Sequence, residues 1–311
     1  MAEVFEFDPR FVRTCSFATL HTPGYGTRVT LYNGVLDANP FAAPMHVSMS
    51  AFAPDGRYMG TTEPFLRLNP GQIDKVEVDE ILKGVVAPEG EELRDVLGVL
   101  HLVPEKWLGK ESVEVSKGEL MTHVFSTDDF VEFFSYRGHV VTGVAYQTGP
   151  MNDLRLSTTR TTTIQAPKVI VSDKVDTIFL LMNVCTRIDY DDDVTLRFKI
   201  FDAKGEVVTE SSITVAGWTF RLLSCREVLE QAGALEEFQQ RGGLGTLYGL
   251  ATDGSLVPLS MTRNDSTGAI AVDHTLPPVY YVNKWGGPLR KQANERLAER
   301  LFANVAQKAA V

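Results

Sequence analysis

The sequence predicts a mainly β protein built from two tandem antiparallel β-sandwich units and closed by a C-terminal amphipathic helix. Three observations support this prediction: ordered matches between the two halves of the chain, short runs of alternating apolar and polar residues, and one long helical pattern near the end. The 311 residues suffice for two domains of about 150 residues each. With 44% hydrophobic and 23% charged residues, the composition is that of an ordinary globular protein.

Ordered internal matches indicate that one unit occurs twice through an internal duplication. Phe52 and the turn residue Gly56 match Phe201 and Gly205 at a shift of 149 residues. The shift falls to 147 for segments 80–82 and 98–101, which match 227–229 and 245–248, and to about 128 near the end of each unit. This last drop places an insertion in the first copy, between 104 and 123. A shared strand-and-turn rhythm without common origin is the alternative explanation.

Alternating residues predict strands with one buried face. Residues 194–200 place Val, Leu, Phe and Ile on one side and Thr, Arg and Lys on the other, as antiparallel sheets require. Long helical periodicity between the strands is absent, which argues against a parallel α/β fold. Two stacked sheets per unit, of jelly-roll or immunoglobulin-like type, explain the pattern most simply. We expect the first unit over residues 1–155 and the second over 156–285.

The segment 286–311 has the pattern of an amphipathic helix. Pro288 suits its first turn, and Leu289, Ala293, Leu297 and Leu301 recur at every fourth position. Such a helix packs either on its own sandwich, which we favour, or on a second subunit. The second arrangement would make the protein a homodimer or a structural homo-oligomer.

Charge and cysteine content limit the partners and the compartment. A net charge of −10 and a pI of about 5.2, with no basic cluster, argue against nucleic acid or an anionic membrane as partner. Three cysteines without CxxC spacing indicate free thiols in a reducing compartment. The N-terminus has acidic residues where a signal peptide needs basic ones, and no apolar run approaches the roughly 20 residues that span a bilayer. We therefore expect a cytoplasmic protein.

No catalytic or cofactor motif appears in the chain. The six histidines show neither the i, i+4 nor the HxH spacing of ligand pairs, and GxSxG, P-loop and HExxH motifs are absent. The acidic run Asp189–Asp193 suits either a Ca²⁺ site or a solvated loop, and we favour the loop. Cys225, beside Arg226 at an expected helix start, is either an activated thiol or, as we favour, a buried inert one. We expect no metal and no cofactor.

The most unusual stretch gathers aromatic residues at the end of the second unit. His274, Tyr280, Tyr281 and Trp285 lie within twelve residues and are typical of a ligand pocket or partner surface at the seam between the units. Aromatics that merely cover the seam beside the terminal helix are the alternative. The sequence thus favours a non-catalytic protein that binds an unknown protein or small molecule there. The alternative function is an enzyme with a metal or acid/base site in the inter-unit cleft, where His274, His101 and Asp273 are the candidates.

Overall fold

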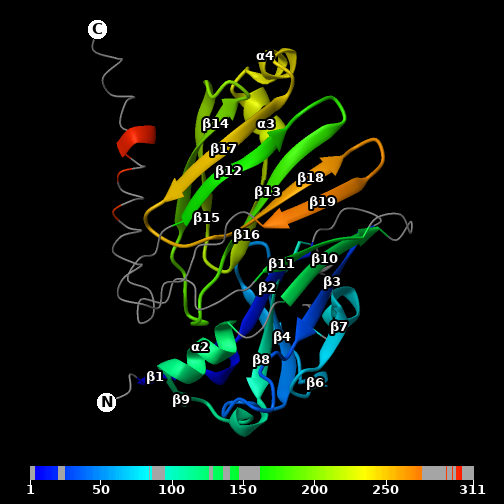
Figure 1. The fold of residues 1–311 in the computed structure, drawn as a ribbon, viewed down its shortest axis with the longest axis vertical. Coiled ribbons are helices and arrows are strands. Elements are labelled where there is room, and N and C mark those ends of the chain that lie inside the picture. The colour runs from blue at the N-terminus through cyan, green and yellow to red at the C-terminus, as the bar shows by residue number, and fades with distance from the viewer. Residues whose placement is uncertain are drawn as a thin grey trace.

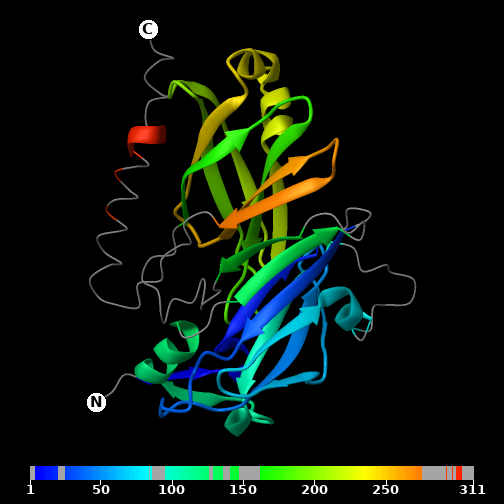
Figure 2. The same cartoon turned by 45° about the vertical axis from the view of Figure 1, so that its right-hand side comes forward.

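The computed structural model describes residues 4–19, 25–83, 85, 95–125, 129–135, 141–146, 162–274, 292, 296 and 299–302. We call residues 4–146 the first half and residues 162–274 the second half. Both are mainly β, and every strand pair within the described ranges is antiparallel. The first half, blue to green, lies below the second half, green to orange, in both views (Figures 1 and 2).

Two sheets share the core of the first half. The β8 sheet has the order β2 (Thr14–Ala18), β8 (Leu97–Pro104), β4 (Met45–Phe52) and β5 (Tyr58–Thr61), and β6 (Leu66–Leu68) also pairs with β4. The β3 sheet has the order β11 (Val141–Tyr146), β10 (Asp129–Ser135), β3 (Tyr25–Tyr32) and β7 (Ile73–Glu77). Apolar side chains of both sheets, such as Met49 and Val29, belong to one buried cluster, as in a β-sandwich.

The second half contains two sheets whose strand orders match those of the two sheets in the first half. The β17 sheet runs β12 (Thr162–Ile170), β17 (Leu244–Ala251), β14 (Val194–Asp202) and β15 (Val207–Val215). The β13 sheet runs β16 (Thr219–Ser224), β13 (Val175–Asn183), β18 (Val257–Asn264) and β19 (Ala269–His274). Matched in chain order, these sheets correspond strand for strand to the β8 and β3 sheets. The alternation predicted for residues 194–200 is confirmed, because all four apolar side chains of that run are fully buried.

The strand pairing bears on one of the sequence matches. Ser50 and Lys199, 149 residues apart, lie opposite Val99 and Tyr248 in the neighbouring strands. A match of Ser50 with Lys199 would therefore pair Tyr248 with Val99, whereas the 147-residue shift pairs it with His101. The partner strands set the register of a strand, whereas a sequence shift also absorbs differences in loop length.

Short helices precede β8 and β17, and an extra segment follows β8 alone. These helices are α1 (Val78–Leu82) in the first half, and α3 (Cys225–Gln231) and α4 (Leu235–Gln240) in the second, and α3 begins at the helix start expected beside Arg226. Between β8 and β10 lie η2 (Glu105–Trp107), β9 (Val113–Ser116) and α2 (Lys117–Phe125), where the insertion was expected. β9 pairs with the N-terminal strand β1 (Val4–Phe7), which leads into η1 (Pro9–Phe11). In the second half, residues 252–256 alone connect β17 to β18.

A continuous apolar core joins the two halves. Ile178, Leu180 and Met182 of β13 belong to the cluster that fills the first half. Phe179 and Leu181, on the opposite face of the same strand, pack against the β17 sheet. Because both of its faces are buried, β13 is an almost uninterrupted apolar run. Strands β11 and β19 also lie against each other where the halves meet (Figure 1).

Trp218, in the turn between β15 and β16, reaches across the same seam. Its ring stacks on Phe52 with 4.4 Å between centroids and an interplanar angle of 2°, and it lies 5.8 Å from Phe11. The main chain of Trp218 has a φ of +56°, a region that L side chains rarely adopt. Packing in the core of the first half offsets this backbone strain.

Part of the expected C-terminal helix is described. Residues 292, 296 and 299–302 are helical, and the rest of 286–311 lies outside the described residues. The ring of Phe302 is buried against β14, with the Arg197 guanidinium 4.6 Å and the Lys199 ammonium 5.5 Å from its centroid. None of the helices in the described ranges combines the length and apolar character needed to cross a bilayer.

Candidate ligand-binding site

The aromatic stretch predicted to form the site is described only at its first residue. His274 is the last residue of β19, and its main chain lies opposite that of Leu259. Tyr280, Tyr281 and Trp285 lie outside the described residues. Ligand binding by these four residues therefore stays a prediction.

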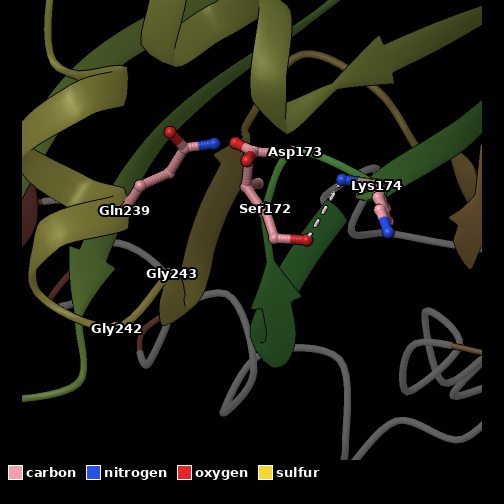
Figure 3. Close-up of a pocket in the computed structure, with 7 residues that line it drawn as sticks. Ser172, Asp173, Lys174, Gln239, Gly242 and Gly243 are labelled. Carbon is pink, nitrogen blue, oxygen red and sulfur yellow. Dashed lines mark hydrogen bonds between the residues drawn. The ribbon is translucent and has the colours of Figure 1, made fainter.

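One hollow lined by described residues lies in the second half, between two turns. Its volume is about 420 Å³, and it is bounded by Ser172, Asp173 and Lys174 after β12 and by Gly242 and Gly243 after α4. Figure 3 shows the Gln239 side chain extending from α4 toward the Ser172–Lys174 turn. The turn's own groups hold it together: the hydroxyl of Ser172 accepts from the main-chain N–H of Lys174 at 3.3 Å, and Arg226 donates to the Ser172 carbonyl at 2.7 Å. We see no converging set of free polar groups here.

A smaller hollow, which we call the Arg10 hollow, lies on the outer face of the β8 sheet. Its volume is about 220 Å³. The N-terminal segment, strand β4, the end of β5 and the insertion after β8 surround it. Its polar lining comes mainly from Asp8, Arg10, His46, Ser48, Thr61 and Lys110, and its apolar lining from Pro9, Pro64, Val103, Trp107 and Leu108.

Arg10 is held in a fixed position at this hollow. Asp8 caps η1 by accepting from the main-chain N–H of Arg10 at 2.9 Å. The same carboxylate accepts from Nε of Arg10 at 3.0 Å and from Nη2 at 2.6 Å. This charged hydrogen bond, which Arg10 donates to the Asp8 carboxylate, raises the pKa of Arg10 above its ordinary value. The guanidinium is thus both ionised and oriented, while about a third of the side chain stays exposed.

His46 also lines the hollow, beside a second charge pair. Its Nε2 lies 3.7 Å from the carboxylate of Glu105, which also accepts from Arg67 at 3.1 Å. The hydrogen bond from Arg67 lowers the pKa of Glu105, so this carboxylate remains ionised. The side chains of Arg67 and Glu105 are about half exposed, so we attribute little stability to their pairing, whereas the His46 side chain is only 20% exposed.

A chain of hydrogen bonds, buried at His101 and Ser50 and exposed at Tyr58, runs beside the hollow. Nδ1 of His101 lies 2.7 Å from the carbonyl oxygen of Arg10, and its Nε2 lies 2.7 Å from Oγ of Ser50. Oγ of Ser50 lies 2.6 Å from Oγ1 of Thr61, which lies 2.6 Å from the hydroxyl of Tyr58. Tyr58 also interacts with the Arg10 side chain, so the chain begins and ends on Arg10.

Chemistry sets the direction of every bond in this chain. The Arg10 carbonyl can only accept, so Nδ1 of His101 carries the ring proton. Burial lowers the pKa of His101 to about 4, so the ring is neutral at pH 7 and its Nε2 accepts from Ser50. Thr61 must then donate to Ser50, and Tyr58 to Thr61. Each group has one donor role and one acceptor role, which leaves a single arrangement.

The pair of Ser50 and His101 has the connectivity of a nucleophile and its base, yet two facts oppose catalysis. Both side chains are fully buried, with 0% exposure. A histidine with a pKa of about 4 is a weak general base near neutral pH, and burial of an imidazolium without a carboxylate would be costly. The hydrogen bonds of Ser50 and His101 therefore suit a structural role in holding the site better than a role in proton transfer.

A second buried histidine lies behind Trp107. The ring of His123, on α2, lies edge-on to Trp107 with 5.4 Å between centroids. Neither ring nitrogen has a hydrogen-bond partner among the described residues. Burial lowers the pKa of His123 to about 4, although the Glu119 carboxylate lies 3.7 Å away and opposes that shift. Trp107 separates this neutral ring from the hollow.

Two other candidates from the sequence have structural roles. Cys225 is fully buried at the start of α3, and burial raises the pKa of its thiol well above the ordinary value. Its burial agrees with the interpretation as an inert thiol, which stays a prediction. In the Asp189–Asp193 loop the acids are exposed and Tyr190 is buried. The described residues contain no group of three or more His, Cys, Asp or Glu placed to hold a metal ion.

Sequence reasoning missed most of the Arg10 hollow. His101 was named for a different cleft, and Arg10, Ser50 and Thr61 were not singled out. These four residues come from separate segments and share no spacing, so only the polar residues on the outer face of β4 hinted at a site.

Comparisons with known proteins do not identify the chain. No protein-family model matches the sequence, and no curated protein matches it. Similar solved structures include a glycosyl hydrolase family 2 member from Bacteroides cellulosilyticus, at 8% identity and a TM-score of 0.18 over 84% of this chain and 25% of that one. A putative beta-galactosidase from Bacteroides fragilis shows 10% identity and a TM-score of 0.16 over 86% of this chain and 33% of that one. The chain thus spans a quarter to a third of their length. These TM-scores are too low to support any argument about function.

Proposed function

We propose that this chain is a non-catalytic binding protein whose small-molecule ligand occupies the Arg10 hollow. The observation that carries the proposal has two parts. Hydrogen bonds to Asp8 and from His101 hold Arg10 in one orientation, and the only serine–histidine pair among the described residues is fully buried. Fixed polar groups beside an apolar wall are typical of a ligand site. Its volume of about 220 Å³ lies below the range for drug-sized ligands, so we expect a small compound.

The matching surface of the second half supports an assignment to the first half alone. On β14, Thr195, Arg197 and Lys199 stand where β4 has His46, Ser48 and Ser50. There, Phe302 from the C-terminal segment lies over the two cations. The insertion that borders the Arg10 hollow has no counterpart between β17 and β18. The first half thus has an open hollow on this face of its sheet, whereas Phe302 covers the matching face of the second half.

We further propose that the two halves arose by duplication of one sandwich unit and diverged in this way. Identical strand orders in both pairs of sheets support this origin. So do the matching hairpin turns, in which Gly56 and Gly205 have φ values of +85° and +82°. Trp218, with φ of +56°, stands where the first half has Gly71, with φ of +77°. We also propose that the segment 286–311 is a helix that packs on the β17 sheet through Phe302.

A ligand screen with hollow-filling variants tests the binding function. A fragment library is screened by saturation-transfer NMR against the wild type and against Leu108→Trp, which fills the hollow from its exposed rim, with Ser48→Leu as a second filling variant. Gln239→Trp, in the larger hollow, is the matched control. We expect fragments that bind the wild type and the control but neither filled variant.

Other patterns in this screen would contradict the proposed site. Loss of binding in Gln239→Trp alone would place the ligand in the larger hollow. Loss only in a Tyr280→Ala/Tyr281→Ala double variant would place it at the aromatic stretch predicted from the sequence. If no fragment responds to filling the Arg10 hollow in a folded variant, the proposal is wrong.

A further inference from the structure

We infer that the Arg10 hollow selects a small carboxylate attached to an apolar body, with Arg10 as the residue that binds the carboxylate. This inference rests on the proposed binding function and deepens it by naming the chemical class of the ligand.

The charges that face the hollow are unbalanced toward positive. Asp8 is the single acid among the lining residues, and its charge is matched by Arg10. Lys110 also lines the hollow, and it forms no ion pair with any described residue. A ligand with one negative charge would therefore neutralise the hollow, whereas a cation would add to its positive charge.

The orientation of Arg10 leaves part of its guanidinium available. Asp8 engages Nε and Nη2, and Tyr58 interacts with the same side chain, so these two partners use only part of the guanidinium's donors. A guanidinium has five N–H donors in a planar fork, and a carboxylate presents two oxygens that fit such a fork. Arg10 can thus hold Asp8 on one edge and a ligand carboxylate on the other.

The hydrogen-bonded chain fixes the backbone from which Arg10 projects. His101 donates to the Arg10 carbonyl, and its ring packs edge-on against Phe11 with 5.0 Å between centroids. Since Ser50 and Thr61 hold His101 in one tautomer, the main chain at Arg10 is ordered before any ligand arrives. Ordering in advance lowers the entropic cost of binding. Ser50 and His101 are therefore positioning residues, and they do not touch the ligand themselves.

The remaining wall suits an apolar body. Pro9, Pro64, Val103, Trp107 and Leu108 face the hollow, and Trp107 is almost fully buried by its surroundings. A neutral polyol would leave its hydroxyl groups against these apolar surfaces, which costs free energy. A compact aromatic or branched aliphatic carboxylate meets both the wall and the guanidinium.

Benzoate and benzamide test the inference, because they share a shape and differ in charge. Binding to the full-length chain is measured by isothermal calorimetry and by chemical-shift perturbation. We expect benzoate to bind at least tenfold more tightly than benzamide. Arg10→Gln should abolish this preference, while Lys83→Gln, the same change of charge at an exposed position on the far side of α1, should leave it unchanged.

Ser50→Ala separates positioning from a general loss of structure. We expect this variant to weaken benzoate several-fold and to leave benzamide unchanged, since only the carboxylate depends on the orientation of Arg10. A general structural defect would weaken both probes equally, and that result would overturn the positioning role.

The possible failures are distinguishable. Equal affinity of the two probes, both lost on filling the hollow by Leu108→Trp, would overturn the carboxylate inference and leave the binding function intact. Failure of both probes while other fragments bind in the hollow has the same meaning. Failure of both probes with no hollow-dependent fragment at all would remove the proposed function and the inference together.

Discussion

Asn33 and Asn183 occupy matching positions at the ends of β3 and β13, and each side-chain amide binds two main-chain carbonyl groups at matching positions of its own half. Both side chains are fully buried. The acceptors are Ala43 at 2.9 Å and Leu68 at 3.2 Å in the first half, and Asp192 and Val215, both at 2.9 Å, in the second. A buried amide thus ties a central strand to the same two neighbouring segments in both halves. Equivalent contacts of this kind are difficult to explain by a shared strand rhythm alone.

The two asparagines differ at their side-chain oxygens, and this difference yields a prediction. Oδ1 of Asn183 accepts from the Tyr190 hydroxyl at 2.9 Å. Phe41 stands at the matching position of the first half, and Oδ1 of Asn33 has no partner among the described residues. We expect Phe41→Tyr to raise the free energy of unfolding by about 1 kcal/mol, and Tyr190→Phe to lower it by about 1–2 kcal/mol. Urea denaturation measures both, and a less stable Phe41→Tyr variant would contradict the proposed equivalence.

Trp218 should couple the stability of the two halves. Trp218→Gly relieves the strained backbone but removes a buried ring, so we expect a net loss of about 2–4 kcal/mol. A double-mutant cycle with Phe52→Leu should give a coupling energy of about 0.5–1.5 kcal/mol for the stacked pair. Chemical denaturation followed by fluorescence provides the values. Two separate unfolding transitions already in the wild type would show that the shared core does not make the halves cooperative.

The buried histidines predict a loss of stability in mild acid. The folded pKa of His101 is about 4, against about 6.5 for an unfolded histidine. A depressed histidine pKa means that the unfolded state binds the proton more readily, so stability is fully present above pH 6.5 and falls as the pH decreases toward 4. A difference of about 2.5 pKa units corresponds to about 3 kcal/mol across this window. His123, whose pKa is also about 4, should add a further decrease in the same window.

Replacement by leucine should distinguish these two histidines. His123 makes no hydrogen bond with the described residues, so His123→Leu should be neutral or stabilising at pH 7 and should flatten the acid decline. His101→Leu should cost about 2–4 kcal/mol at pH 7, because it leaves Ser50 and the Arg10 carbonyl without their partner. Urea midpoints between pH 8 and pH 4 measure both effects. A strongly destabilised His123→Leu would reveal a polar partner for that ring.

The three thiols should be inert in the native protein. Cys15, Cys185 and Cys225 are all buried, and burial raises the pKa of Cys225, so little thiolate is present at neutral pH. We expect no reaction with a thiol-specific disulfide reagent until denaturant is added. Ser211→Cys, on the exposed part of β15, supplies a positive control that should react at once. Rapid labelling of Cys225 in the native wild type would contradict its burial.

Local pattern was sufficient to predict much of the fold. The alternation in residues 194–200 and the helix start beside Cys225 follow from periods and residue types within a few neighbours, and the structure bears them out. These features depend on short-range geometry, because a strand alternates its side chains wherever the rest of the chain lies.

Tertiary structure alone decided the shared core and the candidate site. Nothing local to β13 reveals that one face packs on the first half and the other on the second. His101 meets the Ser50–Thr61 hairpin pair through pairing of the distant strands β4 and β8, and it reaches Arg10 across 91 residues, so no spacing in the sequence predicts this set. Trp218 shows the same limit, since its unusual φ is tolerated only because a distant ring, Phe52, stacks against it. Contacts of this kind join residues that are far apart in the sequence, so the local pattern of apolar and polar residues does not predict them.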